Sequence, residues 1–414
     1  MTTLQTDTKG KEVSSPHIGT VWKNKNFLIL FFAGAILSLG NRVYELALPL
    51  ILYELTHSSV AMSTMRAIEF LPNLFLAMFI GVLVDRTNKK VWSLWMIVTQ
   101  IVILLILFTL LQLDYVRLIV FYIAGFLLMT FNYGYFNARF SIVKHVLPTE
   151  LLTSANAKFS FVSTLIGIMG PAISVFILSL AELHHGLLVT SITLTVAFLI
   201  MLRLDSSETP VVVKKGSFRK ELKEGWIELR RNRALWLITI LVIFLNSTAG
   251  MFDAMIIFFA KDELFLTNSQ LGFALSMAGI GGLVGSILVP YARKYIRTGH
   301  LLGMTILLLG VSYFMMYLAD SIVMLSVALF FSGLIATIEN VCIWTFRQES
   351  TPSHLIGRIS GITGSIFKLG MPLTIIGSGW VSLWFGTSYV FLAAALFNLV
   401  IFIFYKNLSL WKLK

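Results

Sequence analysis

Charged side chains stand inside long apolar stretches of this sequence. Arg42 and Glu45 lie in one such stretch, and Arg66 and Glu69 lie in the next. In each pair the two residues are spaced i, i+3, so in a helix they share one face. Burying a charge is costly unless the charge is paired or reaches water. These four residues therefore predict ion pairs, proton-binding groups or contacts to a charged ligand.

The positions of the four charges also predict which of them meet. If the two stretches form antiparallel helices, Arg42 and Glu69 lie equally far from the matching helix ends, and so do Glu45 and Arg66. At about 1.5 Å of rise per residue, the charges then lie at two shared levels. We therefore predict the cross-helix pairs Arg42–Glu69 and Glu45–Arg66. Pairing within each helix is the alternative.

Four residues further along the chain are also candidates for a polar cavity. Asp253, Glu339 and Lys368 lie in later apolar stretches, and Trp344 follows Glu339 closely. A carboxylate beside an aromatic ring can hold a cationic or zwitterionic ligand, or carry a proton. Glu339 has no arginine within one helical turn of the sequence, so it is the predicted proton-binding group. The alternatives are a structural Glu339–Lys368 pair and an Asp253 that lies at the outer mouth of the cavity.

Histidine and cysteine offer no comparable chemistry in the sequence. All the histidines fall in predicted loops or tails or at the very start of a predicted span, so proton transfer must rest on Glu45, Glu69, Asp253 or Glu339. The single cysteine, Cys342, lies in an apolar stretch, and a lone cysteine excludes an intrachain disulfide. No metal-binding motif is recognisable, and we expect neither a cofactor nor a metal.

The composition predicts that the apolar stretches cross a membrane. Of the 414 residues, 57% are hydrophobic and 13% are charged, which is about half the charged share of a soluble protein. A run of about 20 apolar residues is long enough for a transmembrane helix. We predict twelve spans, of which the third and fourth are the least clearly divided: 27–52, 60–84, 91–113, 116–140, 152–180, 185–203, 234–259, 269–292, 299–319, 321–346, 355–383 and 386–405.

The basic residues predict the orientation of these spans. If both termini are cytoplasmic, most of the 32 lysines and arginines face the cytoplasm, and the external loops hold only Arg117 and Lys261. This bias follows the positive-inside rule. The net charge of +12 is then a topology signal, so we expect no nucleic-acid partner. We expect a monomeric, multi-pass protein that contacts the lipids of a bacterial plasma membrane.

The spans divide into two halves of six. We predict a cytoplasmic tail over 1–26, a bundle over 27–204, a linker over 205–233, a second bundle over 234–405 and a tail over 406–414. Apolar and basic residues alternate in the linker with helical spacing, which favours an amphipathic helix on the inner leaflet. A solvated linker helix is the alternative.

Short segments recur in the two halves. Pro148-Thr149-Glu150-Leu151-Leu152 precedes the fifth span, and Pro352-Ser353-His354-Leu355-Ile356 precedes the eleventh. Gly170-Pro171 in the fifth span matches Gly370-Met371-Pro372 in the eleventh. This weak similarity indicates that the two halves are repeats of one another.

The loop between the second and third spans carries the most distinctive motif. It is Gly81-Val82-Leu83-Val84-Asp85-Arg86-Thr87-Asn88-Lys89-Lys90. The glycine permits close approach of helices, the carboxylate ends a helix, and the basic residues hold the loop in the cytoplasm. The pattern resembles the loop between the second and third helices of the major facilitator superfamily of transporters.

Further motifs narrow the resemblance to the multidrug:proton antiporter branch, which contains macrolide and siderophore exporters. The sequence departs from the pattern of this branch at two places. Many relatives carry an aspartate after the glycine of the first span, where this sequence has Asn41-Arg42. The glycine–proline motif at 167–171 is present only in a reduced form. The similar segments are Gly40-Asn41, Ala47-Leu48-Pro49-Leu50, Leu71-Pro72, Phe218-Arg219, Glu224-Gly225, Gly357-Arg358-Ile359-Ser360 and Thr363-Gly364-Ser365.

The resemblance implies an all-α membrane protein with twelve transmembrane helices in two six-helix pseudo-repeats, the major facilitator fold. It implies export of a small molecule by alternating access, driven by protons. In the family the loop described above approaches the start of the eleventh span, where Arg358 lies. We therefore predict that Asp85, with Arg358 and nearby amides, latches the outward-open state, and that Gly81 permits the approach.

Two other functions are compatible with the same fold. One is movement of a lysolipid or similar amphiphile between the halves, and the other is a membrane sensor without transport. Enzymatic activity has no support, because the sequence has no Walker-type loop, metal cluster or catalytic spacing of Ser, His and Asp. We expect a small-molecule substrate and protons as partners.

Overall fold

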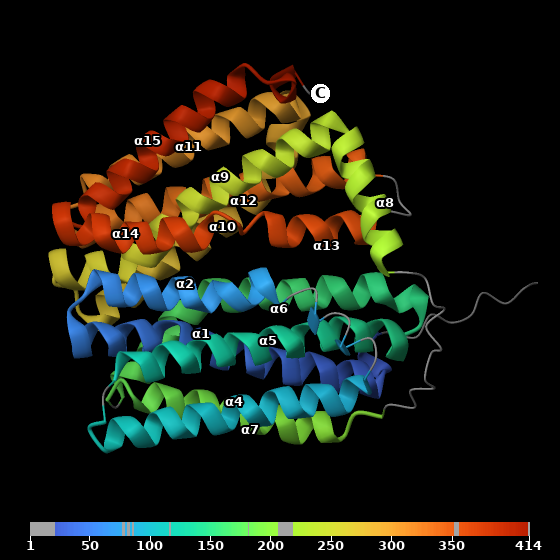
Figure 1. Ribbon diagram of the computed structural model, residues 1–414, viewed down its shortest axis with the longest axis vertical. Helices are drawn as coiled ribbons and strands as arrows, with labels where there is room; N and C mark the ends of the chain where they lie inside the picture. The colour runs from blue at the N-terminus through green and yellow to red at the C-terminus, as the bar shows by residue number, and fades with distance from the viewer. Residues whose placement is uncertain are drawn as a thin grey trace, which may run out of the picture.

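The computed structural model describes residues 21–76, 79–80, 83–84, 87–115, 117–180, 182–205, 218–351 and 356–412. The described residues form an almost entirely helical bundle (Figure 1). Eleven of its helical segments are long and apolar enough to cross a membrane. The helix α2 is second in the chain order and corresponds to the remaining one of the twelve predicted spans.

The first six spans form the lower half of the bundle in Figure 1. The predicted division between the third and fourth spans is confirmed, because α4 ends at Gln112 and α5 begins at Leu118. The helices are α1 (Lys25–Thr56), α2 (Ser59–Phe75), α4 (Lys89–Gln112), α5 (Leu118–Val146), α6 (Thr149–Ser179) and α7 (His185–Leu202), preceded by the short turn η1 (Val21–Lys23).

The other six spans form the upper half, and the helix α8 (Phe218–Arg231) packs against helices of this half at one end. The upper half contains α9 (Arg233–Phe258), η2 (Phe259–Glu263), α10 (Asn268–Tyr295), α11 (Thr298–Tyr317), α12 (Ile322–Ser350), α13 (Ile356–Ile366), α14 (Met371–Phe385), α15 (Ser388–Lys406) and the turn η4 (Ser409–Lys412).

Side-chain caps explain where many of these helices begin. The Asn24 side chain accepts a hydrogen bond from the Phe27 amide, Asn88 accepts one from Val91, and Asn232 accepts one from Leu235. Such caps satisfy amides that have no partner within the helix. Short polar residues between apolar runs therefore act as boundaries of the spans.

The eleventh span differs from its prediction as one helix over 355–383. It consists of α13 and α14, and the chain between them, Phe367–Gly370, is not α-helical. The Asn246 amide of α9 donates to the Phe367 carbonyl at 3.0 Å, so this break has a polar partner within the bundle. Pro372 begins α14, where its missing amide is not needed.

Two ends of the bundle need names. We call the end where α1 begins and where α8 lies the α8 end, and the opposite end, where α9 meets η2, the η2 end (Figure 1). Contact between the halves runs mainly through α2 with α14 and through α6 with α10. These four helices therefore form the interface at which a space between the halves opens or closes.

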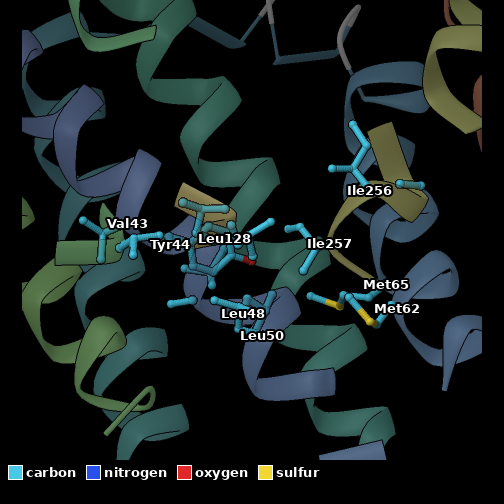
Figure 2. Close-up of a cluster of buried hydrophobic side chains, with 14 of the residues drawn as sticks. Val43, Tyr44, Leu48, Leu50, Met62, Met65, Leu128, Ile256 and Ile257 are labelled. Atoms are coloured by element: carbon cyan, nitrogen blue, oxygen red, sulfur yellow. The ribbon is translucent and has the colours of Figure 1, made fainter. Parts of the chain in front are cut away.

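The η2 side of this interface is closely packed. A Cβ built at Gly279 of α10 would lie 2.6 Å from the Ile168 Cα of α6. Figure 2 shows the neighbouring core, where Met62 and Met65 of α2 lie beside Ile257 of α9, from the other half. Small residues allow helices in a membrane to approach closely and gain dispersion energy.

The α8 side of the interface is open. Ser163, Thr164 and Leu165 are three successive residues of α6, and all are exposed. Successive residues point about 100° apart on a helix, so these three side chains leave a broad face of α6 uncovered at this level. A Cβ at Gly167 of α6 would also meet no atom within 4 Å, so we infer that this level of the interface borders a water-accessible space that faces the α8 end.

Candidate functional site

The charges of α1 and α2 pair within each helix, so the predicted cross-helix pairs are wrong. The Arg42 Nη1 lies 2.7 Å from Glu45 Oε2, and the Arg66 Nη1 lies 3.0 Å from Glu69 Oε2. The spacing i, i+3 brings both partners together without help from a second helix. The helices are instead linked by Tyr44, whose hydroxyl donates to Glu69 Oε1 at 2.8 Å.

The two pairs differ in their surroundings. The side chains of Arg42 and Glu45 are 44% and 36% exposed, whereas the Glu69 side chain is 6% exposed. The Arg42 stem packs against Gly170 of α6, where a Cβ would lie 3.0 Å from Arg42 Cγ. The Arg66–Glu69 pair is therefore part of the packed structure, and the Arg42–Glu45 pair borders open space.

This difference predicts unequal costs of removing each carboxylate. We expect Glu69→Gln to lower the free energy of unfolding by about 3 kcal/mol, because it removes the buried carboxylate that is hydrogen-bonded to Arg66. We expect at most about 1 kcal/mol for Glu45→Gln, because its pair is exposed. Unfolding of the two purified variants in detergent measures the difference, and equal losses would contradict the assignment.

Glu339 is buried in α12 and has no ion-pair partner among the described residues. Its side chain is 7% exposed, and its Oε2 makes no hydrogen bond. The alternative that Lys368 pairs with it is not found in the structure. A carboxyl group buried in this way must find a proton, a water molecule or a ligand.

Asp253 of α9 is exposed, and it lies at the interface between the halves. Arg66 of the other half is within electrostatic reach of it. Tyr313 of α11 is within reach of both Asp253 and Glu339, and its ring stacks on Phe252 with centroids 4.4 Å apart. The structure therefore brings Asp253 and Glu339 into one neighbourhood.

Lys368 and Trp344 lie nearer the α8 end. Lys368 is half-buried in the break between α13 and α14, and Trp344 of α12 is exposed. The neighbouring Arg347 is a residue that the sequence analysis missed, because the predicted span ends at 346. Its guanidinium lies 4.6 Å from the ring centroids of both Trp344 and Phe367. The i, i+3 spacing of Trp344 and Arg347 could have indicated this contact.

In the predicted gating loop, Gly81, Asp85 and Arg86 fall outside the described residues, and so does the side chain of Arg358. Lys89 and Lys90 are described, and Lys90 Nζ donates to the Leu204 carbonyl at 2.6 Å. This contact ties the start of α4 to the chain just beyond α7.

A set of contacts between the halves at the η2 end was not foreseen. The Tyr53 hydroxyl of α1 donates to Asp262 Oδ1 of η2 at 3.3 Å. The Ser59 hydroxyl of α2 donates to the Gly379 carbonyl of α14 at 3.0 Å. No sequence spacing relates residues so far apart in the chain, so only the assembled fold could reveal them. They hold the η2 end shut.

The candidate site is therefore asymmetric. The two arginines and two glutamates of α1 and α2 are paired with each other, whereas Glu339 and Lys368 of the second half have no ion-pair partner among the described residues. Paired charges have little left to offer a ligand, and an unpaired buried charge still requires a partner. Recognition of a charged ligand or proton is expected in the second half, at the space open to the α8 end.

Comparison with known proteins places this architecture in one family. Residues 30–375 match the family model described as Major Facilitator Superfamily. Macrolide efflux protein A of Streptococcus pyogenes is 26% identical over 399 residues, covering 90% of this chain and 92% of that protein. Multidrug efflux pump Tap of Mycolicibacterium fortuitum is 23% identical over 396 residues, covering 90% and 93%.

The similarity extends to solved structures. The crystal structure of the nucleoside transporter NupG superposes with a TM-score of 0.74 at 14% identity, covering 94% of this chain and 100% of that one. This likeness concerns the fold, which has the twelve helices and two six-helix pseudo-repeats expected from the sequence. The chain belongs to the Major Facilitator Superfamily and is a multi-span membrane transporter of small molecules.

Proposed function

We propose that this chain exports a small amphipathic molecule, such as a drug, an antibiotic or a siderophore, in exchange for protons. The observation that carries the proposal is Glu339, a buried carboxyl group without an ion-pair partner among the described residues. The relatives named as macrolide and multidrug efflux proteins support the direction and the class of cargo.

The proposed orientation puts the α8 end in the cytoplasm of a bacterial cell and the η2 end outside. Basic side chains at the α8 end support it, among them Arg230 and Arg231 of α8 and Arg293 and Lys294 of α10. The space open to the α8 end then faces the cytoplasm, from which an exporter takes its cargo. The membrane is the plasma membrane.

In this mechanism the proton and the cargo use the same carboxyl group in turn. Facing the cytoplasm, Glu339 releases its proton and attracts a cationic or polar group of the cargo, while Trp344 offers an aromatic surface. Facing outward, the group exchanges the cargo for a proton. Neutral Glu339 no longer carries a buried charge, which favours the return of the empty transporter.

The change of access requires two gates. Contacts such as Tyr53–Asp262 and Ser59–Gly379 close the η2 end and must break before cargo leaves. At the α8 end, the predicted latch of Asp85 on Arg358 closes in their place. That latch lies outside the described residues, and it rests on the family resemblance of the loop.

A susceptibility panel tests this function. Expression in an efflux-deficient host is expected to raise the inhibitory concentration of at least one macrolide or similar amphipathic drug. A protonophore at a non-growth-inhibiting dose is expected to remove the protection, because it collapses the gradient. A host that gains no protection against any compound, or protection that survives the protonophore, would contradict proton-driven export.

A further inference from the structure

Three potential metal ligands meet at the η2 end, away from the transport interface. Glu182 lies in the connection between α6 and α7, His184 directly precedes α7, and His185 is its first residue. One ligand atom from each lies within 4.8 Å of the other two. Among the described residues this is the only such group of three.

The backbone holds these residues in a compact turn. The His185 amide donates to the Glu182 carbonyl at 2.9 Å, and the Leu187 amide donates to the His184 carbonyl at 3.1 Å. The two imidazole rings stack with centroids 4.4 Å apart, and Phe108 of α4 packs against both. The three ligand residues therefore lie close together because they belong to one hydrogen-bonded turn.

The ring orientation of His184 suits a metal ligand. Its Nε2 lies 2.5 Å from the Gln112 side-chain amide at the end of α4, and its Nδ1 lies 3.3 Å from Glu182 Oε2. A polar contact to one ring nitrogen fixes the tautomer and aims the other nitrogen, as the outer partners of metal-bound histidines do. A half-turn of the Gln112 amide places its oxygen as the acceptor of Nε2–H, and the Nδ1 lone pair of His184 then binds the ion in place of its contact with Glu182.

His185 supplies an independent observation that points to a ligand. Its Nδ1 is buried and has no hydrogen-bond partner. Buried polar atoms of native proteins are nearly always satisfied, so such an atom calls for a bound water or ion. A metal ion shared with His184 and Glu182 would satisfy it.

We propose that Glu182, His184 and His185 bind a divalent transition-metal ion, with Zn²⁺ as the representative ion. Two imidazole nitrogens and one carboxylate oxygen are a common Zn²⁺ ligand set, and water completes the tetrahedron. Ca²⁺ and Mg²⁺ prefer oxygen ligands and are not expected to bind. The sequence alone did not show this site, because adjacent histidines match no spaced metal motif. The site does not depend on the transport function.

The bound ion would act on the connection between α6 and α7. α6 is one of the helices of the first half that pack against the second half. A metal ion that joins Glu182 to His185 holds the end of α6 to the start of α7, and through Gln112 to α4. We expect the ion to stabilise the first half at the η2 end.

Zn²⁺ binding to the purified full-length protein, prepared without a histidine tag, tests the site. Titration calorimetry is expected to give one Zn²⁺ per chain and a rise in the unfolding temperature, and Co²⁺ is expected to give the absorption spectrum of a tetrahedral site. His185→Gln and Glu182→Gln are each expected to weaken binding by at least about tenfold, and Gln112→Leu by about tenfold.

His300→Gln is the matched control. His300 Nδ1 is also buried without a partner, but His300 belongs to no group of ligands among the described residues. This variant is expected to bind Zn²⁺ like the unaltered protein. Glu182 is 78% exposed, so Glu182→Gln tests the site even if His185→Gln does not fold. No binding, or equal binding by the unaltered protein and Glu182→Gln, would overturn the proposal.

Discussion

Replacing Glu339 by glutamine is expected to abolish transport driven by a pH gradient while exchange of labelled for unlabelled cargo continues. Glutamine keeps the shape of the side chain but cannot bind and release a proton. Glu339 is the buried carboxyl group without an ion-pair partner among the described residues, so no neighbour takes over its role. Gradient-driven uptake into proteoliposomes should fall by about tenfold or more, because loss of a typical coupling free energy changes an equilibrium by about that factor.

Glu349→Gln is the matched control, because it makes the same change on the same helix. The Glu349 side chain is 61% exposed and pairs with Arg293 of α10 at 3.3 Å. This variant should keep gradient-driven transport within about twofold, as exposed pairs contribute little. Full gradient dependence in Glu339→Gln would exclude Glu339 as the coupling group.

Gly279→Val is expected to block transport by preventing closure of the η2 end. A Cβ at Gly279 of α10 would lie 2.6 Å from the Ile168 Cα of α6, and a backbone atom cannot rotate away. The two helices must therefore separate at this level, which favours states with an open η2 end. Transport should fall by about tenfold or more, as for a lost coupling of a few kcal/mol.

A cysteine reporter measures the position of this gate. Ile257→Cys places a thiol where α9 faces α2 in the closed interface without removing a polar contact between the halves, and the native Cys342 is buried, so background labelling by an impermeant reagent is low. Labelling should increase when Gly279→Val is added. Gly167→Val is the matched control, since a Cβ there meets no atom within 4 Å. Normal transport and unchanged labelling in Gly279→Val would show that this contact is not a gate.

Composition was sufficient to predict the spans but not their interruptions. The first span was predicted over 27–52 and α1 covers Lys25–Thr56, since hydropathy does not register the cap at Asn24. The eleventh span was predicted as one helix and is two. Gly370-Met371-Pro372 was visible as a motif, but whether a proline kinks a helix or begins one depends on neighbours such as Asn246.

The charged pairs show a second limit of sequence reasoning. The matched depths made the cross-helix pairs Arg42–Glu69 and Glu45–Arg66 compatible with the sequence. The pairs within each helix were equally compatible with it. Depth says nothing about rotation of a helix about its axis, and rotation decides which side chains meet. In the structure Tyr44 links α1 to α2. An uncharged tyrosine in an apolar stretch gives no signal in the sequence that it makes such a contact.

The unpaired carboxyl was easier to predict. Glu339 has no basic residue one turn away, so its isolation along its own helix could be read from spacing, and the structure adds isolation from the neighbouring helices. The latch at Asp85 and Arg358 stays a prediction. Cargo selection is likewise not encoded in any motif, because it depends on the shape of a cavity built from many helices.

Proton release during cargo uptake tests the central claim most directly. In inverted membrane vesicles that have an acidic interior, adding a macrolide should raise the internal pH, reported by recovery of a pH-sensitive dye, because each cargo molecule enters as protons leave. Vesicles with Glu339→Gln should show no recovery. Cargo accumulation in vesicles with the unaltered protein, without any change in internal pH, would contradict proton-coupled export by this chain.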